Sequence, residues 1–82
     1  MKTNEIKKGM RIRLVNGWFG TMKDNMRGNT RVAEVEGYCT EIGSVYSHDI
    51  VACQPAPDAE WIAVEHTPKQ IAFKEKIKTF GY

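Results

Sequence analysis

Met10-Arg11-Ile12-Arg13-Leu14 alternates apolar and basic side chains, and this stretch decides the fold class. Because successive side chains of a β-strand point to opposite faces, the alternation predicts a strand with its apolar side chains inward and both arginines in solvent. Asn16-Gly17 follows, and this dipeptide is the strongest short-range signal for a hairpin turn. We therefore expect Trp18–Met22 to return as a second strand.

The alternation resumes at Thr30–Glu36, where Ala33 and Val35 share one face of a predicted third strand. The intervening residues 23–29 are polar and rich in Gly and Asn, which is typical of a loop.

Glycines then divide the next part of the chain. Gly37 predicts a bulge or a turn. Gly43-Ser44 predicts a turn between a fourth strand, Tyr38–Ile42, and a fifth, Val45–Val51. Short strands separated by turn residues favour a small barrel or sandwich over a parallel sheet.

The clearest helix start lies near the C-terminus. Thr67 fits the N-cap position, Pro68 fits the first helical position, and Gln70 completes a capping box. We expect a helix over Pro68–Thr79. Its apolar stripe consists of Phe73, Ile77 and Phe80.

The chain of 82 residues is expected to form one domain, residues 1–82. A mainly β body covers residues 8–53, a proline-containing connector covers residues 54–59, and residues 60–82 hold a last strand, Trp61–Val64, and the helix. The predicted fold class is a small barrel of five or six short strands with one C-terminal α-helix.

Residues 8–22 resemble the opening of an SH3-like barrel of the KOW type. Such modules begin with a glycine, an alternating strand, a glycine-containing turn and a second strand, and Gly9, Gly17 and Gly20 take the glycine positions here. The resemblance covers about residues 8–51. It implies an SH3-like module that binds protein, RNA or DNA and is not an enzyme. In size, the chain is also similar to the small accessory proteins of bacteriophages and other mobile elements.

Charge is sorted along the chain. Residues 1–31 carry eight basic and two acidic residues, residues 32–66 carry seven acidic and no basic residues, and residues 67–82 carry four lysines and one glutamate. The blocks can neutralise one another across strands, or form separate faces that attract different partners. The acidic block is either a solvated sheet face or a surface that docks on a basic protein.

Aromatic and basic residues near the first hairpin predict a binding surface. The expected anchors are Trp18, Phe19, Tyr38 and Tyr46, and the expected charged rim is Arg11, Arg13, Arg27 and Arg31. The alternative is that Trp18 or Phe19 belongs to the core and that the β-strand arginines pair with Glu34 and Glu36. Trp61 is also large enough to anchor an interface.

No catalytic or metal-binding motif accompanies the potentially reactive residues. Cys39 and Cys53 lack the C-x-x-C spacing of a zinc site, and no nucleophile signature surrounds His48 or His66. No phosphate-binding glycine loop is present either. We expect no enzyme activity, metal or cofactor. We expect both cysteines to be reduced and packed as small apolar residues. A pocket for a small nucleotide-like ligand is a further alternative.

The N-terminus lacks the apolar stretch of a signal peptide, and no apolar run approaches the roughly 20 residues of a membrane span. The sequence therefore predicts a cytoplasmic protein without a membrane partner. The expected function is a non-catalytic protein-binding adaptor or inhibitor of the phage or mobile-element type. The alternative is a nucleic-acid-binding module that uses the basic hairpin. The C-terminal helix either covers an open end of the body, docks on a second copy to form a homo-oligomer or on a partner protein, or lies on an acidic lipid surface.

Overall fold

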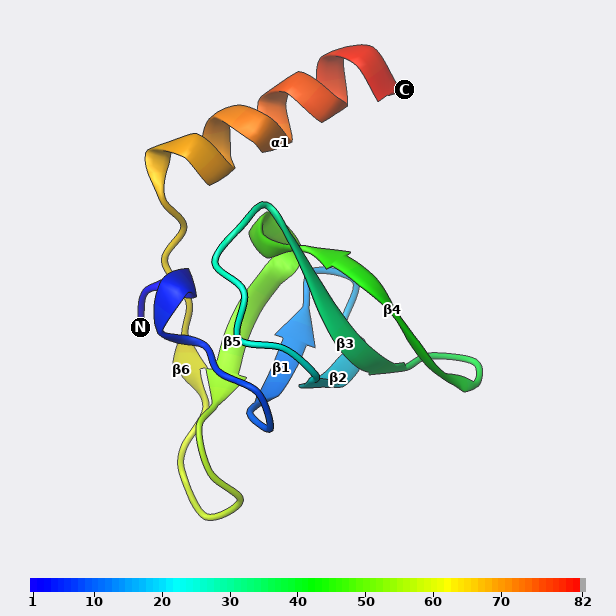
Figure 1. Cartoon of the computed structure of the whole chain (residues 1–82), viewed down its shortest axis with the longest axis vertical. Helices are drawn as coiled ribbons and strands as arrows, with labels where there is room; N and C mark the ends of the chain where they lie inside the picture. Colours follow the sequence, from blue (N-terminus) through cyan, green and yellow to red (C-terminus); the bar gives the residue numbers. More distant parts are fainter. Residues whose placement is uncertain (82) are drawn as a thin grey trace.

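A six-stranded antiparallel sheet forms the body of this computed structural model, which describes residues 1–81 and the side chains of residues 1–77 (Figure 1). The strands are β1 (Arg11–Leu14), β2 (Phe19–Met22), β3 (Thr30–Glu36), β4 (Thr40–Tyr46), β5 (Ile50–Gln54) and β6 (Ile62–Ala63). Their order is β4-β3-β2-β1-β5-β6, so β1 to β4 form a meander and β5 returns to β1. Within residues 1–81, the expected mainly β fold with short strands and one C-terminal α-helix, α1 (Pro68–Gly81), is confirmed.

The first strand has the predicted orientation. Ile12 and Leu14 are buried, while Arg13 is exposed. The turn that follows has Gly17 at a φ of 91°, a left-handed conformation that glycine adopts without steric cost. The inner face of the sheet and the N-terminal segment together form the core, which consists of Ile6, Ile12, Leu14, Met22, Ala33, Ile50 and Cys53.

The turn expected at Gly43-Ser44 is wrong. These residues lie within β4, which pairs with β3 over its whole length and places Gly43 opposite Ala33. The chain turns at residues 37–39 instead, and a 3-10 helix, η2 (Ser47–Asp49), interrupts the strand expected over Val45–Val51. Pairing along a long partner strand has overridden the local preference of glycine and serine for a turn.

Strand β3 places a charged residue on the buried face. Arg31 lies two residues before Ala33, so the period of two turns both side chains inward, and only 1% of Arg31 is exposed. The expectation that Arg31 belongs to an exposed charged rim is therefore wrong. Its guanidinium donates to the Thr3 carbonyl oxygen at 2.9 Å, Asn4 Oδ1 at 3.0 Å, Ser47 Oγ at 2.9 Å and the Gly28 carbonyl oxygen at 3.4 Å.

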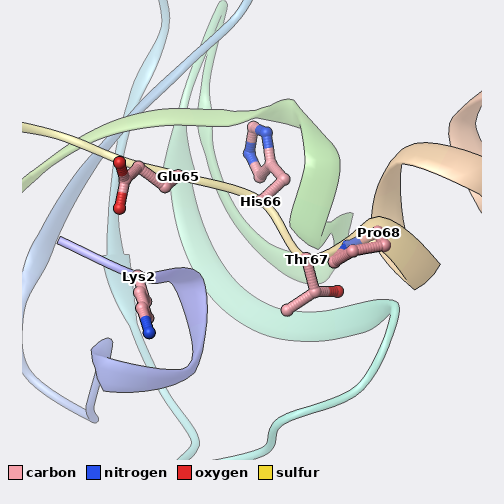
Figure 2. Close-up of a pocket in the computed structure, with 5 residues that line it drawn as sticks. All are labelled: Lys2, Glu65, His66, Thr67 and Pro68. Carbon is pink, nitrogen blue, oxygen red and sulfur yellow. The ribbon is translucent and has the colours of Figure 1, made fainter.

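The N-terminal segment is part of the fold, which the sequence did not predict. It forms a short 3-10 helix, η1 (Thr3–Glu5), and runs beside the segment that joins β6 to α1 (Figure 2). The backbone N–H of Thr3 donates to the Glu65 carbonyl at 3.0 Å, and the N–H of Glu65 donates to the Met1 carbonyl at 2.8 Å. These bonds hold the first residues of the chain against the base of α1.

Helix α1 begins with the predicted capping box. The N–H of Gln70 donates to Thr67 Oγ1 at 3.2 Å, and the N–H of Thr67 donates to Gln70 Oε1 at 2.9 Å. Phe73 of the predicted stripe packs against Tyr46, with ring centroids 5.7 Å apart, and Ile77 is half-buried. Phe80 lies outside the described side chains. The start of α1 thus rests on the end of the body near η2, and the helix then runs across one end of the molecule (Figure 1).

Replacing Arg31 by Lys is expected to lower the free energy of unfolding by about 2–4 kcal/mol, because an ammonium group keeps the charge but cannot reach all four acceptors of the planar guanidinium. Urea unfolding followed by circular dichroism measures this difference. The matched control is Arg27→Lys at an exposed position of the adjacent loop, which should change stability by less than about 0.5 kcal/mol. Equal stability of the two variants would contradict the structural role of Arg31.

Candidate functional site

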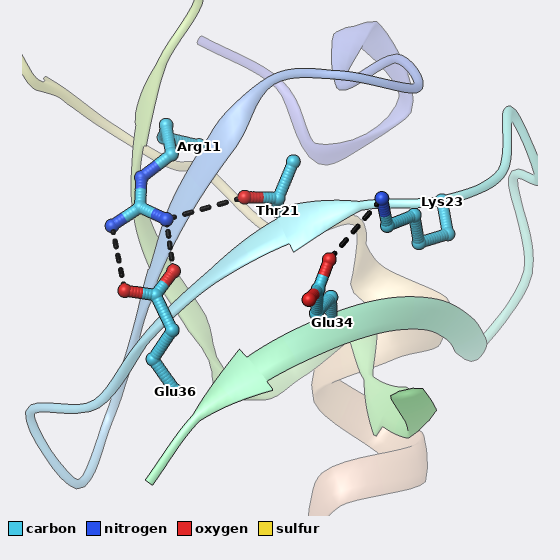
Figure 3. Close-up of polar contacts among 5 residues, drawn as sticks. All are labelled: Arg11, Thr21, Lys23, Glu34 and Glu36. Carbon is cyan, nitrogen blue, oxygen red and sulfur yellow. Dashed lines mark hydrogen bonds and ion pairs between the residues drawn. The ribbon is translucent and has the colours of Figure 1, made fainter. Parts of the chain in front are cut away.

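The outer face of β1, β2 and β3 brings the basic and acidic blocks together (Figure 3). Arg11 donates to Thr21 Oγ1 at 3.2 Å and forms an ion pair with Glu36. The Lys23 ammonium lies 3.2 Å from Glu34 Oε2. The hydrogen bond from Arg11 holds the pKa of the Glu36 carboxyl below its ordinary value, against the opposing effect of partial desolvation. At these positions the charge blocks neutralise one another across strands.

An aromatic pair lies beside these ion pairs. The rings of Phe19 and Trp61 have centroids 5.5 Å apart, and the two residues are 39% and 40% exposed. Arg13 stands opposite Phe19 in the β1–β2 ladder, is exposed, and has no ion pair among the described side chains. We call Arg13, Phe19 and Trp61 the aromatic patch. Arg13 faces Phe19 across the ladder as an unpaired cation, while the Arg11 guanidinium, which is paired with Glu36, lies 6.0 Å from the centroid of the Phe19 ring.

A second aromatic pair connects the β1–β2 turn, which holds Trp18, to the β3–β4 turn, which holds Tyr38. Trp18 and Tyr38 meet edge to face with ring centroids 5.7 Å apart, and Tyr38 is fully exposed. The Trp18 ring lies directly over Gly37, where any Cβ atom would overlap it. A side chain at position 37 would therefore displace the ring, which explains the glycine at this turn.

The eight predicted site residues do not form one surface. Arg11, Arg13 and Phe19 share the outer face of the sheet, and Trp18 and Tyr38 pair between the β1–β2 and β3–β4 turns. The other three lie elsewhere: Arg27 lines a cleft beside the start of α1, Arg31 is buried, and Tyr46 packs under the helix.

A buried histidine at the base of α1 had no distinguishing signal in the sequence. His48 is 6% exposed, and its ring stacks on Tyr46 at 5.0 Å with an interplanar angle of 11°. Its Nδ1 has no hydrogen-bond partner within the described residues. Burial lowers the pKa of His48 from its ordinary value; Lys74 and His66 add to this effect and Asp49 opposes it.

Two shallow clefts flank the start of α1. The first has a volume of about 340 Å³ and is lined by Lys2, Glu65, His66, Thr67 and Pro68 (Figure 2). The Lys2 ammonium and the His66 ring point away from each other there, and His66 Nε2 bonds the Ile50 carbonyl at 2.8 Å. These side chains do not converge on a common point as a catalytic group would. The second cleft has a volume of about 390 Å³ and is lined by Asn4, Arg27, Gly28, Asn29, Thr67, Lys69 and Gln70.

The two cysteines have different environments. Both are free thiols; Cys53 is buried in the core, as expected for a small apolar residue, whereas Cys39 is exposed at the β3–β4 turn. The expectation of a packed Cys39 is wrong because the chain turns there instead of continuing as a strand. Burial raises the pKa of the Cys53 thiol.

No protein-family model, curated protein sequence or solved structure matches this chain. Among the described residues, no group of three or more His, Cys, Asp or Glu side chains is arranged to hold a metal ion. Within the same part of the chain, no helix has the length and apolar character that crossing a membrane requires.

Thiol labelling should separate the two cysteines. A water-soluble disulfide reagent is expected to modify Cys39 rapidly and Cys53 only after denaturation, because the thiolate is the reactive form and Cys53 is both inaccessible and raised in pKa. Cys39→Ser should abolish the fast phase, and Cys53→Ala should retain it. Two equally fast thiols in the native protein would contradict the placement of Cys53.

The stability of the protein should fall as the pH falls because of His48. Its folded pKa lies below its unfolded value, so its stabilising contribution is complete above the unfolded pKa of about 6.5 and is lost as the pH falls toward the folded pKa. The measurement is urea unfolding of the wild type and of His48→Phe across this range. As the pH falls, the unfolding free energy of the wild type should decrease relative to that of His48→Phe. A difference between the two that does not change with pH would contradict the assignment.

Proposed function

We propose that this protein is a non-catalytic protein-binding module and that the aromatic patch is its docking surface. Aromatic and arginine side chains dominate the energetics of protein interfaces, and partly exposed rings lose little conformational entropy when they are covered. The observation that carries the proposal is the exposed contact between Phe19 and Trp61 beside the unpaired Arg13.

The distribution of cations favours a protein over a nucleic acid as the partner. A groove for a phosphate backbone needs several free cations on one surface. Arg11 and Lys23 are paired with carboxylates, and Arg31 is buried. The two remaining arginines of the predicted rim lie apart: Arg13 is on the sheet face, and Arg27 is in the cleft near α1.

The patch fits a partner segment of definite chemistry. Phe19 and Trp61 offer apolar area, and Arg13 offers a guanidinium whose five donors match a carboxylate. We therefore infer that the partner presents an aliphatic or aromatic side chain next to an aspartate or glutamate. The SH3-like resemblance of residues 8–51 supports this role, since it implies a binding module. The role we propose is a cytoplasmic adaptor or inhibitor of the kind that phages and other mobile elements encode.

Arg13→Glu and Trp61→Ala should each weaken partner binding at least about tenfold, because each removes an anchor near the centre of the patch. The full chain, immobilised and exposed to a nuclease-treated native lysate, captures the partner, and titration of the purified partner gives the dissociation constants. Unfolding of each variant must match the wild type.

Two exposed residues outside the patch provide matched controls. Lys8→Glu repeats the charge reversal, and Val15→Ala repeats the loss of exposed apolar area. Both should bind as the wild type does. Equal binding by all four variants would count against the patch. A partner that is lost with nuclease, with affinity that falls steeply as salt rises, would favour the nucleic-acid alternative.

A further inference from the structure

The second cleft, beside Arg27 and Lys69, has a chemistry that the proposed protein-binding function does not use. It lies between the N-terminal segment, the loop before β3 and the first turn of α1. Both cations are exposed and have no ion pair among the described side chains, and no acidic residue lines the cleft. The lining is therefore cationic on two sides.

Several hydrogen-bond acceptors of this lining are already occupied. The Gly28 carbonyl accepts from Arg31 and Ser47, and the Asn29 carbonyl accepts from the N–H of Ser47 at 2.8 Å. Thr67 Oγ1 accepts from the N–H of Gln70, and the Thr67 carbonyl oxygen accepts from the N–H of Ile71. A ligand that needs to donate hydrogen bonds would find few free partners here.

Two side-chain amides, by contrast, keep free donors. Because Arg31 can only donate, the Asn4 amide presents its oxygen to Arg31 at 3.0 Å. The amide nitrogen of Asn4 therefore remains free to donate. The backbone N–H of Thr67 likewise engages the Gln70 oxygen. Gln70 is only 3% exposed, lines the cleft, and its amide nitrogen makes no hydrogen bond within the described residues. Because this nitrogen is not one of the fully buried unpartnered atoms, it is open to the cleft and can donate to an acceptor bound there.

A buried positive charge lies directly behind the lining. The Arg31 guanidinium bonds Asn4 and Gly28 of the cleft wall, and its four hydrogen-bond acceptors are all uncharged. Because charges interact more strongly away from water, this guanidinium adds positive potential at the cleft beyond that of Arg27 and Lys69.

We propose that this cleft binds the phosphate group of a small phosphorylated ligand. Arg27 and Lys69 neutralise the phosphate, and the free amide nitrogens of Asn4 and Gln70 donate to its oxygens. The volume of about 390 Å³ lies at the lower end of the range for small-ligand clefts, about 300–1,000 Å³. Two cations at one cleft suit a single phosphate group, whereas a nucleic-acid backbone requires a row of cations.

Titration of the full chain with inorganic phosphate at constant ionic strength tests the site. In ¹⁵N-correlated NMR spectra, saturable shifts are expected at the backbone amides of Gly28, Asn29 and Lys69 and at the side-chain amides of Asn4 and Gln70. A dissociation constant in the millimolar range is expected for phosphate alone, and a nucleoside monophosphate should bind more tightly.

Arg27→Gln and Lys69→Gln should each weaken phosphate binding about five- to tenfold, because each removes a charge-assisted contact. Lys76→Gln is the matched control, an exposed lysine about two turns further along α1, and should bind within about twofold of the wild type. Gln70→Glu keeps the capping oxygen but replaces the free donor with a negative charge. It should abolish binding while circular dichroism shows an intact helix.

Several results would overturn the proposal. Shifts that do not saturate, or that spread evenly over the chain, would indicate only general screening by the anion. Equal affinity of Arg27→Gln, Lys69→Gln and the wild type would remove the cleft as the site. A short single-stranded oligonucleotide that binds far more tightly than the monophosphate, with a steep dependence on salt, would assign the cleft to a nucleic-acid backbone instead.

Discussion

The guanidinium of Arg31 is the interaction on which the arrangement of the other segments depends. It reaches from the inner face of β3 to the carbonyls of Thr3 and Gly28, to Asn4 and to the hydroxyl of Ser47. These groups belong to the N-terminal segment, the loop before β3 and the 3-10 helix before β5. A small domain buries little apolar surface, so one residue that ties three irregular segments to the sheet replaces packing that the core cannot supply.

The same residue carries the cost of a buried charge. Desolvation lowers the pKa of Arg31 from its ordinary value, and the charge of Asp24 partly opposes this shift. Neutral acceptors compensate the charge less completely than a carboxylate in direct contact would. Arg31 bonds Asn4 and Gly28 in the wall of the cleft between the N-terminal segment and α1, so under the proposal above its charge acts on a phosphate bound there. A structural requirement of the fold thus shapes the chemistry of a surface site.

Local signals in the sequence predicted the elements whose cause is local. The hairpin at Asn16-Gly17 and the capping box of Thr67 and Gln70 form as expected, because their residues bond one another over short separations. The turn at Gly43-Ser44 failed because pairing with β3 decides the conformation of β4. Arg31 lies two residues before Ala33 in the same strand, so the alternation of side chains alone indicates that it faces inward. Its hydrogen-bond partners in the N-terminal segment and η2, by contrast, are set by tertiary structure. For the same reason, the predicted binding residues were dispersed over separate surfaces.

The sorting of charge along the chain acquires its meaning from the strand order. The basic β1 and the acidic β3 are both neighbours of β2, so Arg11 reaches across β2 to Glu36, and Lys23, just beyond the end of β2, reaches Glu34. Exposed ion pairs of this kind contribute little stability, but they remove both signs of charge from the middle of the outer face. The cations left without a carboxylate include Arg13 beside the two aromatic rings, and Arg27 and Lys69 at the cleft. Under the two proposals above, Arg13 serves the protein partner, whereas Arg27 and Lys69 serve the phosphate group.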